Sequence, residues 1–315
     1  MSSSFLPYTF YTIVFDTFRI LYMPSVPPFS RSEKLEDYAQ RCYPIKWEEQ
    51  HIKSSDGTRI SLINSGDISV GQSSRTDAVE DTHLLILYFQ GNAGSLPPRT
   101  PYLADTLKTV SRFASKDGPP AKISLTAVSY RGFWTSKGRP SQKGIELDAA
   151  AALDWAVKKY SSNPKFRIVI WGASVGSGVS TTAVAAYREI KATNPIIKGL
   201  ILETPFTNLS TLLQDFYPQR WLPYRYLTPF LRSHWDSKAA LQRIAQSRAD
   251  KRPSLLILQA GNDEVVPSTH GVELEAWCRT LNFDIEKKTI PALHTEIMTK
   301  SAGREEIAKY LLKFL

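Results

Sequence analysis

The chain has 315 residues, of which 42% are hydrophobic and 22% charged, and these fractions are ordinary for a globular protein. They exclude a disordered chain and a membrane bundle, and the length suffices for one large α/β core. The net charge of +9 would suit a nucleic-acid-binding protein, but the sequence has no basic run with interleaved aromatic residues. We therefore expect no nucleic-acid partner.

The two cysteines, Cys42 and Cys278, lie far apart in the sequence. This spacing excludes a disulfide framework and indicates a reducing, intracellular compartment. Neither the cysteines nor the histidines have the spacing of metal ligands, so we expect no metal and no cofactor. The sequence also shows no secretory signal, and we expect a protein that is cytoplasmic or peripherally associated with a membrane.

Residues 1–44 are expected to form an N-terminal arm with an amphipathic helix. Apolar residues recur there at helical spacing, at Phe10, Val14, Phe18 and Leu21. Pro7, Asp16 and Arg19 interrupt the apolar run, which argues against a transmembrane helix. Such a helix either packs on the protein's own core or contacts a lipid surface.

From residue 45 to residue 315, apolar segments of strand type alternate with helical segments. The expected strands are 45–54, 58–64, 83–89, 122–129, 166–171, 198–203, 255–259 and 284–290. The expected helices are 102–114, 145–159, 181–189, 269–281 and 304–315. The pattern predicts one α/β domain with a doubly wound, mostly parallel eight-stranded sheet, whose site lies at the carboxyl ends of the strands.

A buried-strand run ending at Trp171 is followed by the sequence Gly-Ala-Ser-Val-Gly at residues 172–176. A serine presented on a sharp turn between a strand and a helix needs neighbours with almost no side chain. Gly172 and Gly176 meet that need, so Ser174 is the candidate nucleophile. The alternative is a turn that merely connects the strand to the helix.

A serine hydroxyl needs a general base, and the base needs an acid that fixes its orientation. Of the five histidines, only His294 follows the last predicted strand and lies at the expected edge of the sheet. Two adjacent acids, Asp263 and Glu264, follow the preceding strand. We favour Asp263, because the acid in this topology usually comes directly after the turn at the strand end, and Glu264 remains the alternative.

With these residues in place, the chain from about residue 45 resembles the α/β-hydrolase superfamily, and within it the intracellular serine hydrolases related to lysophospholipid lipases and protein depalmitoylases. Beside the order Ser174, Asp263, His294, the segments 91–94 (Gly-Asn-Ala-Gly) and 130–133 (Tyr-Arg-Gly-Phe) are similar to motifs of that group, as are Ser136, Gly138, Pro140, Ser141, Gly144 and Asp148.

The resemblance implies an α/β-hydrolase fold and an oxyanion hole formed by the backbone N–H groups of Asn92 and Val175. It implies that Arg131 braces its loop and is not catalytic. Three residues depart from the group's pattern: Gln90 replaces a histidine, Trp134 a glycine and Gln142 a glutamate.

One interval, residues 205–253, is far longer than a single crossover helix requires and is expected to form a helical cap over the site. It is rich in aromatic residues and carries eight basic against three acidic residues, five of the nine net positive charges. The alternative is a compact surface excursion whose aromatic residues pack only on each other.

These features predict a serine hydrolase that cleaves a carboxylic ester or thioester, with a lipophilic small-molecule substrate and possible peripheral contact with a membrane. Two other hypotheses remain open at this point. One is an enzyme that uses the same three residues on a C–C bond or a specialised metabolite, and the other is a non-catalytic scaffold or binding protein.

Overall fold

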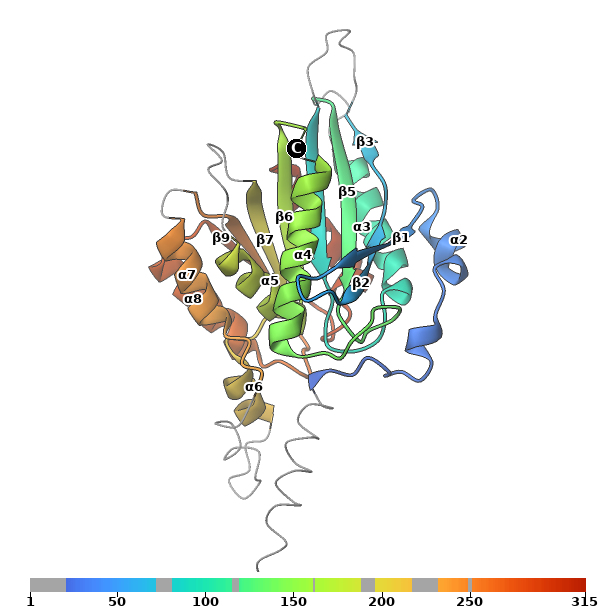
Figure 1. Ribbon diagram of the computed structural model, residues 1–315. Coiled ribbons are helices and arrows are strands. Elements are labelled where there is room, and N and C mark those ends of the chain that lie inside the picture. The colour runs from blue at the N-terminus through green and yellow to red at the C-terminus, as the bar shows by residue number, and fades with distance from the viewer. Residues whose placement is uncertain are drawn as a thin grey trace, which may run out of the picture.

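The computed structural model describes residues 21–71, 81–114, 119–160, 162–187, 196–216, 232–248 and 251–315. Within these ranges, nine strands form one sheet in the order β1-β2-β5-β4-β6-β7-β8-β9, with β3 paired to β5 outside that path (Figure 1). The strands are β1 (Glu48–Lys53), β2 (Arg59–Asn64), β3 (Ile68–Val70), β4 (Thr82–Phe89), β5 (Ala121–Ser129), β6 (Phe166–Ala173), β7 (Ile197–Glu203), β8 (Ser254–Ala260) and β9 (Ile285–Ile290).

The sheet is parallel from β5 through β4, β6, β7 and β8 to β9. Strands β1, β2 and β3 join it antiparallel. The predicted α/β architecture with a mostly parallel sheet is therefore confirmed.

The prediction of eight strands missed β3. Its three residues follow a polar stretch and only Val70 is buried, so no apolar run marks the strand in the sequence. It forms because β2 pairs with β5 at residues 126–129 and leaves the beginning of β5, at residues 121–123, open to a partner.

Helices cover both faces of the sheet, and a separate apolar core lies on each face (Figure 1). One core includes side chains of α4 (Gln142–Tyr160), α5 (Val175–Ala186), α7 (Ser237–Ser247) and α8 (Ser268–Thr280), and the other includes those of α3 (Thr100–Phe113) and α9 (Ser301–Leu312). In β4, Leu85 and Leu87 face the first core while Leu84 and Ile86 face the second. A strand buried on both faces reads as a continuous apolar run, which is how β4 was predicted.

The described part of the N-terminal arm contains the short helices η1 (Ser30–Ser32), η2 (Glu36–Tyr38) and α2 (Ala39–Cys42). Three of the four residues of the expected amphipathic helix, Phe10, Val14 and Phe18, lie outside the described residues. No helix in the described ranges is long and apolar enough to cross a membrane.

The interval 205–253 contributes α6 (Leu209–Phe216) and α7 to the described structure. The expected cap aromatics Tyr217, Trp221, Tyr224, Tyr226 and Phe230 lie outside it, as do Leu222, Arg220 and Arg225. Trp235 is described and belongs to the core, with none of its surface exposed.

Candidate active site

Ser174 lies on the turn between β6 and α5. Its backbone has a φ of 54°, a positive value that residues other than glycine rarely adopt. A Cβ at Gly172 would collide with the carbonyl oxygen of Gly176, and a Cβ at Gly176 would collide with that of Phe89. Both positions therefore require glycine, and the serine is held on a sharp turn against the ends of β4 and β6.

His294 and Asp263 meet Ser174 from two other loops. The Oγ of Ser174 lies 2.9 Å from Nε2 of His294. The Nδ1 of the same ring lies 2.9 Å from each carboxylate oxygen of Asp263. The three side chains predicted from the sequence thus form one continuous hydrogen-bonded chain.

Asp263 is held as a carboxylate by its surroundings. Burial by itself would raise the pKa of Asp263, but hydrogen bonds from His294 and from the backbone N–H groups of Val266 and Val265 outweigh it and hold that pKa below its ordinary value. The neighbouring Glu264 does not contact the imidazole ring; its Oε2 accepts the backbone N–H of His294 at 2.9 Å. The two adjacent acids therefore hold different parts of the same residue.

The other four histidines lie in different surroundings. His51 bonds the hydroxyl of Ser61, His83 bonds Ser124, and His270 bonds Thr207. The backbone N–H of His234 donates to Gln142. Only His294 of the five contacts Ser174.

The predicted oxyanion turn, residues 90–94, follows β4 and lies against the nucleophile. A Cβ placed on Gly91 would lie 3.6 Å from the Cβ of Ser174. Within the described residues, the backbone N–H groups of Asn92 and Val175 donate no hydrogen bond. The absence of a partner for these two amides is compatible with the predicted oxyanion hole.

Three carbonyl groups of this turn accept hydrogen bonds, two from distant parts of the chain and one from the segment that follows the turn. The carbonyl of Gln90 accepts the hydroxyl of Tyr130 at 2.8 Å. The carbonyl of Asn92 accepts the N–H of Met23 at 2.8 Å, and that of Ala93 accepts Nη2 of Arg99 at 3.1 Å. Three carbonyls of the turn are therefore held, while the N–H of Asn92 donates no hydrogen bond within the described residues.

Arg131 braces the loop after β5, as predicted. Its guanidinium lies 2.8 Å from the wholly buried carboxylate of Asp148 and 2.7 Å from that of Asp56. A Cβ at Gly144 would collide with the same guanidinium, so this glycine makes room for the brace.

The three departures from the family pattern have distinct structural settings. Gln90 is buried, and neither atom of its side-chain amide has a partner among the described residues. Trp134 keeps a positive φ of 42°, the backbone conformation that favours glycine. Oε1 of Gln142 accepts the N–H groups of His234 and Trp235, so it holds the part of the interval 205–253 that precedes α7.

Glu203, at the end of β7, is a residue of the site that the sequence reasoning missed. Its carbonyl accepts the N–H of Ser174 at 2.8 Å, and its carboxylate accepts Nε1 of Trp171 at 2.9 Å. Burial raises the pKa of Glu203 to about 7. An acid ending an otherwise apolar strand, at the edge where the site was expected, was the signal available in the sequence.

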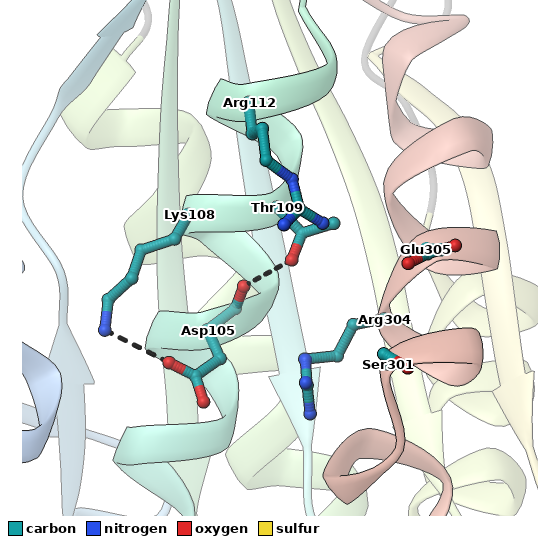
Figure 2. Close-up of a pocket in the computed structure, with 7 residues that line it drawn as sticks. All are labelled: Asp105, Lys108, Thr109, Arg112, Ser301, Arg304 and Glu305. Atoms are coloured by element: carbon teal, nitrogen blue, oxygen red, sulfur yellow. Dashed lines mark hydrogen bonds and ion pairs between the residues drawn. The ribbon is translucent and has the colours of Figure 1, made fainter.

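Two pockets lie away from these residues. One, of about 390 Å³, lies between α3 and α9 (Figure 2). Lys108 forms an ion pair with Asp105 there. Arg112 and Arg304 add positive charge to its lining. The second, of about 260 Å³, lies between α4 and α5. Neither is lined by Ser174, Asp263 or His294, so the triad geometry alone locates the candidate site.

No protein-family model matches the chain. It is 33% identical over 201 residues to a lysophosphatidylserine lipase, ABHD12, of Macaca fascicularis, covering 63% of this chain and 46% of that protein. It is 26% identical over 193 residues to the protein bem46 of Schizosaccharomyces pombe, covering 61% and 56%. The chain thus spans about half the length of the curated relatives it matches.

Solved structures show the same fold at low sequence identity. An α/β hydrolase from Vibrio vulnificus superposes with a TM-score of 0.66 at 15% identity, covering all of this chain and 95% of that one. The esterase Pf2001 of Pyrococcus furiosus gives 0.58 at 17% identity, over 90% and 92% of the two chains. The architecture is that of the α/β-hydrolase fold.

Proposed function

We propose that this chain, a member of the α/β-hydrolase superfamily, is a serine hydrolase that cleaves carboxylic esters through an acyl-enzyme on Ser174. The observation that carries the proposal is the hydrogen-bonded chain from Asp263 through His294 to Ser174. A scaffold or binding protein would have no need for these three groups in this order. Their presence argues against the non-catalytic alternative.

In the acylation step, Oγ of Ser174 attacks the ester carbonyl while Nε2 of His294 takes its proton. The carboxylate of Asp263 keeps the imidazole oriented and stabilises its protonated form. The negative charge that develops on the carbonyl oxygen is received by the N–H groups of Asn92 and Val175, each contributing about 3 kcal/mol in the transition state. His294 then returns the proton to the leaving oxygen, the ester C–O bond breaks, and the acyl group remains on Ser174.

Deacylation repeats the sequence with water as the nucleophile. His294 takes a proton from the water, whose oxygen attacks the acyl carbon, and the proton then passes to Oγ as the bond to Ser174 breaks. The products are a carboxylic acid and the restored serine. A thioester would follow the same steps with a thiol as the leaving group.

Ser174→Ala tests this mechanism directly. We expect hydrolysis of p-nitrophenyl esters to fall by several orders of magnitude, and covalent labelling by a fluorophosphonate probe to disappear. The thermal unfolding temperature should stay near that of the wild type. If the purified variant keeps more than roughly a hundredth of the wild-type turnover, Ser174 is not the nucleophile.

We further propose a lipophilic acyl ester with an anionic neighbour as the substrate, met at a membrane surface inside the cell. Two features support this: relatives that include a lysophosphatidylserine lipase, and the coincidence of aromatic and basic residues in the interval 205–253. Aromatic surface takes an acyl chain out of water, and each basic residue near an anionic surface contributes about 1 kcal/mol.

The substrate proposal is tested by changing Arg220, Arg225 and Arg232 together to Gln. We expect weaker co-sedimentation with anionic vesicles and a smaller preference for charged over neutral lysophospholipids. The matched control changes three half-exposed lysines far along the chain, Lys288, Lys309 and Lys313, to Gln, for the same loss of charge. If the two triple variants behave alike, the basic residues of this interval do not select the substrate, and a panel of small neutral esters, acyl thioesters and C–C substrates becomes the next test.

A further inference from the structure

Residues 21–33, here called the strap, cross the carboxyl edge of the sheet beside the oxyanion turn. Figure 1 shows this first described segment, in dark blue, passing along the end of the sheet where α6 follows β7. The N–H of Met23 donates to the carbonyl of Asn92 at 2.8 Å, and Met23 forms an isolated parallel bridge with Ala93. The strap therefore adds one residue of strand to the turn that presents the N–H of Asn92.

The residue before Met23 fixes the strap to another part of the site. Tyr22 is only 4% exposed, and its hydroxyl accepts Nε1–H of Trp235 at 2.8 Å. The same hydroxyl lies 3.1 Å from Oγ of Ser233. Both partners lie in the interval 205–253, in the segment directly before α7.

Trp235 is in turn packed on the helix that begins at the nucleophile. Its side chain is fully buried, and a Cβ at Gly178 would lie 2.9 Å from its own Cβ. The path from α5 through Trp235 and Tyr22 to Met23 and Asn92 thus connects the two sides of the oxyanion hole. Every step in this path is a hydrogen bond, a close packing contact or a covalent bond.

The Tyr22 hydroxyl is suited to this position because burial raises the pKa of Tyr22 to about 12, which keeps the group protonated. It can therefore accept from Trp235 and donate to Ser233 at once. Removing it would leave the buried indole N–H of Trp235 without a partner, and buried polar groups are costly to leave unpaired.

We propose that Tyr22 is a positioning residue for ester hydrolysis, because it anchors the strap that holds the carbonyl of Asn92 and thereby orients the Asn92 N–H in the oxyanion hole. Gln90 and Ala93, on either side, are held by the side chains of Tyr130 and Arg99. Among the described residues, Asn92 depends on the strap for its carbonyl bond. The inference rests on the proposed function, since it assigns the strap a part in that reaction.

Tyr22→Phe removes the hydroxyl and keeps the ring. We expect kcat for a p-nitrophenyl ester to fall about tenfold to a hundredfold, the range that a small displacement of a catalytic group produces, with KM changed less than about twofold. The affinity for a trifluoromethyl ketone, whose adduct with Ser174 carries an oxyanion, should fall by the same factor as kcat/KM. Amide hydrogen exchange in residues 91–95 should become faster, whether or not an ester is turned over.

Tyr310→Phe is the matched control. Tyr310 is 2% exposed, and its hydroxyl donates to the carbonyl of Ser254 at 2.7 Å and accepts the N–H of Leu200 at 3.2 Å. Ser254 begins β8, so this tyrosine lies at the amino edge of the sheet, away from the site. The control should lose comparable stability while keeping kcat and the exchange rates of residues 91–95.

Trp235→Phe removes the other partner of the hydrogen bond. Because the two groups act through one contact, the double variant should lose little more kcat than either single variant. Additive losses would contradict a shared path.

The outcomes separate this inference from the proposed function. If wild-type protein is labelled by fluorophosphonate and Tyr22→Phe keeps its kcat, or if Tyr310→Phe loses as much, the inference is wrong and the hydrolase assignment stands. If wild-type protein neither turns over esters nor is labelled, the proposed function fails. Unchanged exchange in residues 91–95 of Tyr22→Phe would overturn the strap's positioning role even in that case.

Discussion

The nucleophile turn and the oxyanion turn form two sides of the same site, but they are held in different ways. The nucleophile turn is fixed by close packing of backbone atoms, where Gly172 lies against Gly176 and Gly176 lies against Phe89 at the end of β4. The oxyanion turn is fixed by hydrogen bonds from Met23, Arg99 and Tyr130, residues of three separate segments.

This difference has consequences for both sequence reading and mutation. A turn that needs close backbone packing leaves a signature of glycines at fixed spacing, whereas a turn held through its backbone carbonyls leaves little trace in its own residues, because every residue has a carbonyl. We therefore expect single changes at the nucleophile turn or its partners to have large effects. Changes to the residues that hold the oxyanion turn should have smaller and graded effects, because each of the three donors holds a different carbonyl.

The largest effect should come from the acid that supports the nucleophile through His294. Asp263→Asn should lower kcat about ten-thousandfold, because the amide favours the wrong imidazole tautomer. Glu264→Gln is the control of the same chemical type and should cost less than about tenfold, since Glu264 bonds only the backbone of His294. Steady-state kinetics of the two variants decide between the acids, and a worse loss in Glu264→Gln would reverse the assignment.

Gly176→Ala tests the packing of the nucleophile turn itself. The added methyl group would meet backbone atoms of Phe89 and Gln90, which cannot rotate away as a side chain can. We expect a loss of about 3 kcal/mol or more in the free energy of unfolding, measured by urea denaturation. Gly57→Ala, at an open turn with positive φ and no neighbouring atoms, should lose only the smaller backbone strain. Equal losses in the two variants would show that the close approach at Gly176 is unimportant.

Glu203→Gln tests the buried acid whose carbonyl holds the Ser174 amide. Burial raises the pKa of Glu203 from the ordinary glutamate value of 4.5 to about 7, so its protonated form favours folding below pH 4.5 and that advantage disappears as the pH rises through 7. The wild type should therefore lose about 3 kcal/mol relative to Glu203→Gln between pH 4.5 and pH 8. Urea denaturation of both proteins across this range measures the difference, and a difference that is constant with pH would contradict the raised pKa.

The smallest effect should come from the oxyanion turn, where Tyr130→Phe removes the bond to the carbonyl of Gln90. We expect a loss of about 1 kcal/mol in the free energy of unfolding, the usual net value of one hydrogen bond. The value of kcat should fall only a few-fold, because the carbonyl of Asn92 keeps its own bond to Met23. A loss as large as that of Asp263→Asn would show that the bond to Gln90 controls the site as strongly as the acid does.

The sequence by itself determined the features that depend on neighbours along the chain. Continuous apolar runs predicted β4 and β6 because a strand buried on both faces shows no alternation. The glycines around Ser174 predicted the sharp turn, and the order of Ser174, Asp263 and His294 predicted which strand ends must meet. These signals are local, so they survive in a single sequence.

The tertiary structure decided what depends on distant segments. Asp263 and Glu264 are adjacent carboxylates, and only the path of the loops shows that Asp263 reaches the imidazole while Glu264 reaches the backbone. Strand β3 exists because part of β5 is left open by β2, and Trp235 is a core residue because Gly178 of α5 leaves room for it. The hydrogen bond from Met23 to Asn92 is a contact of the same kind. Such contacts join residues far apart in the chain, where neither spacing nor propensity leaves a local signal.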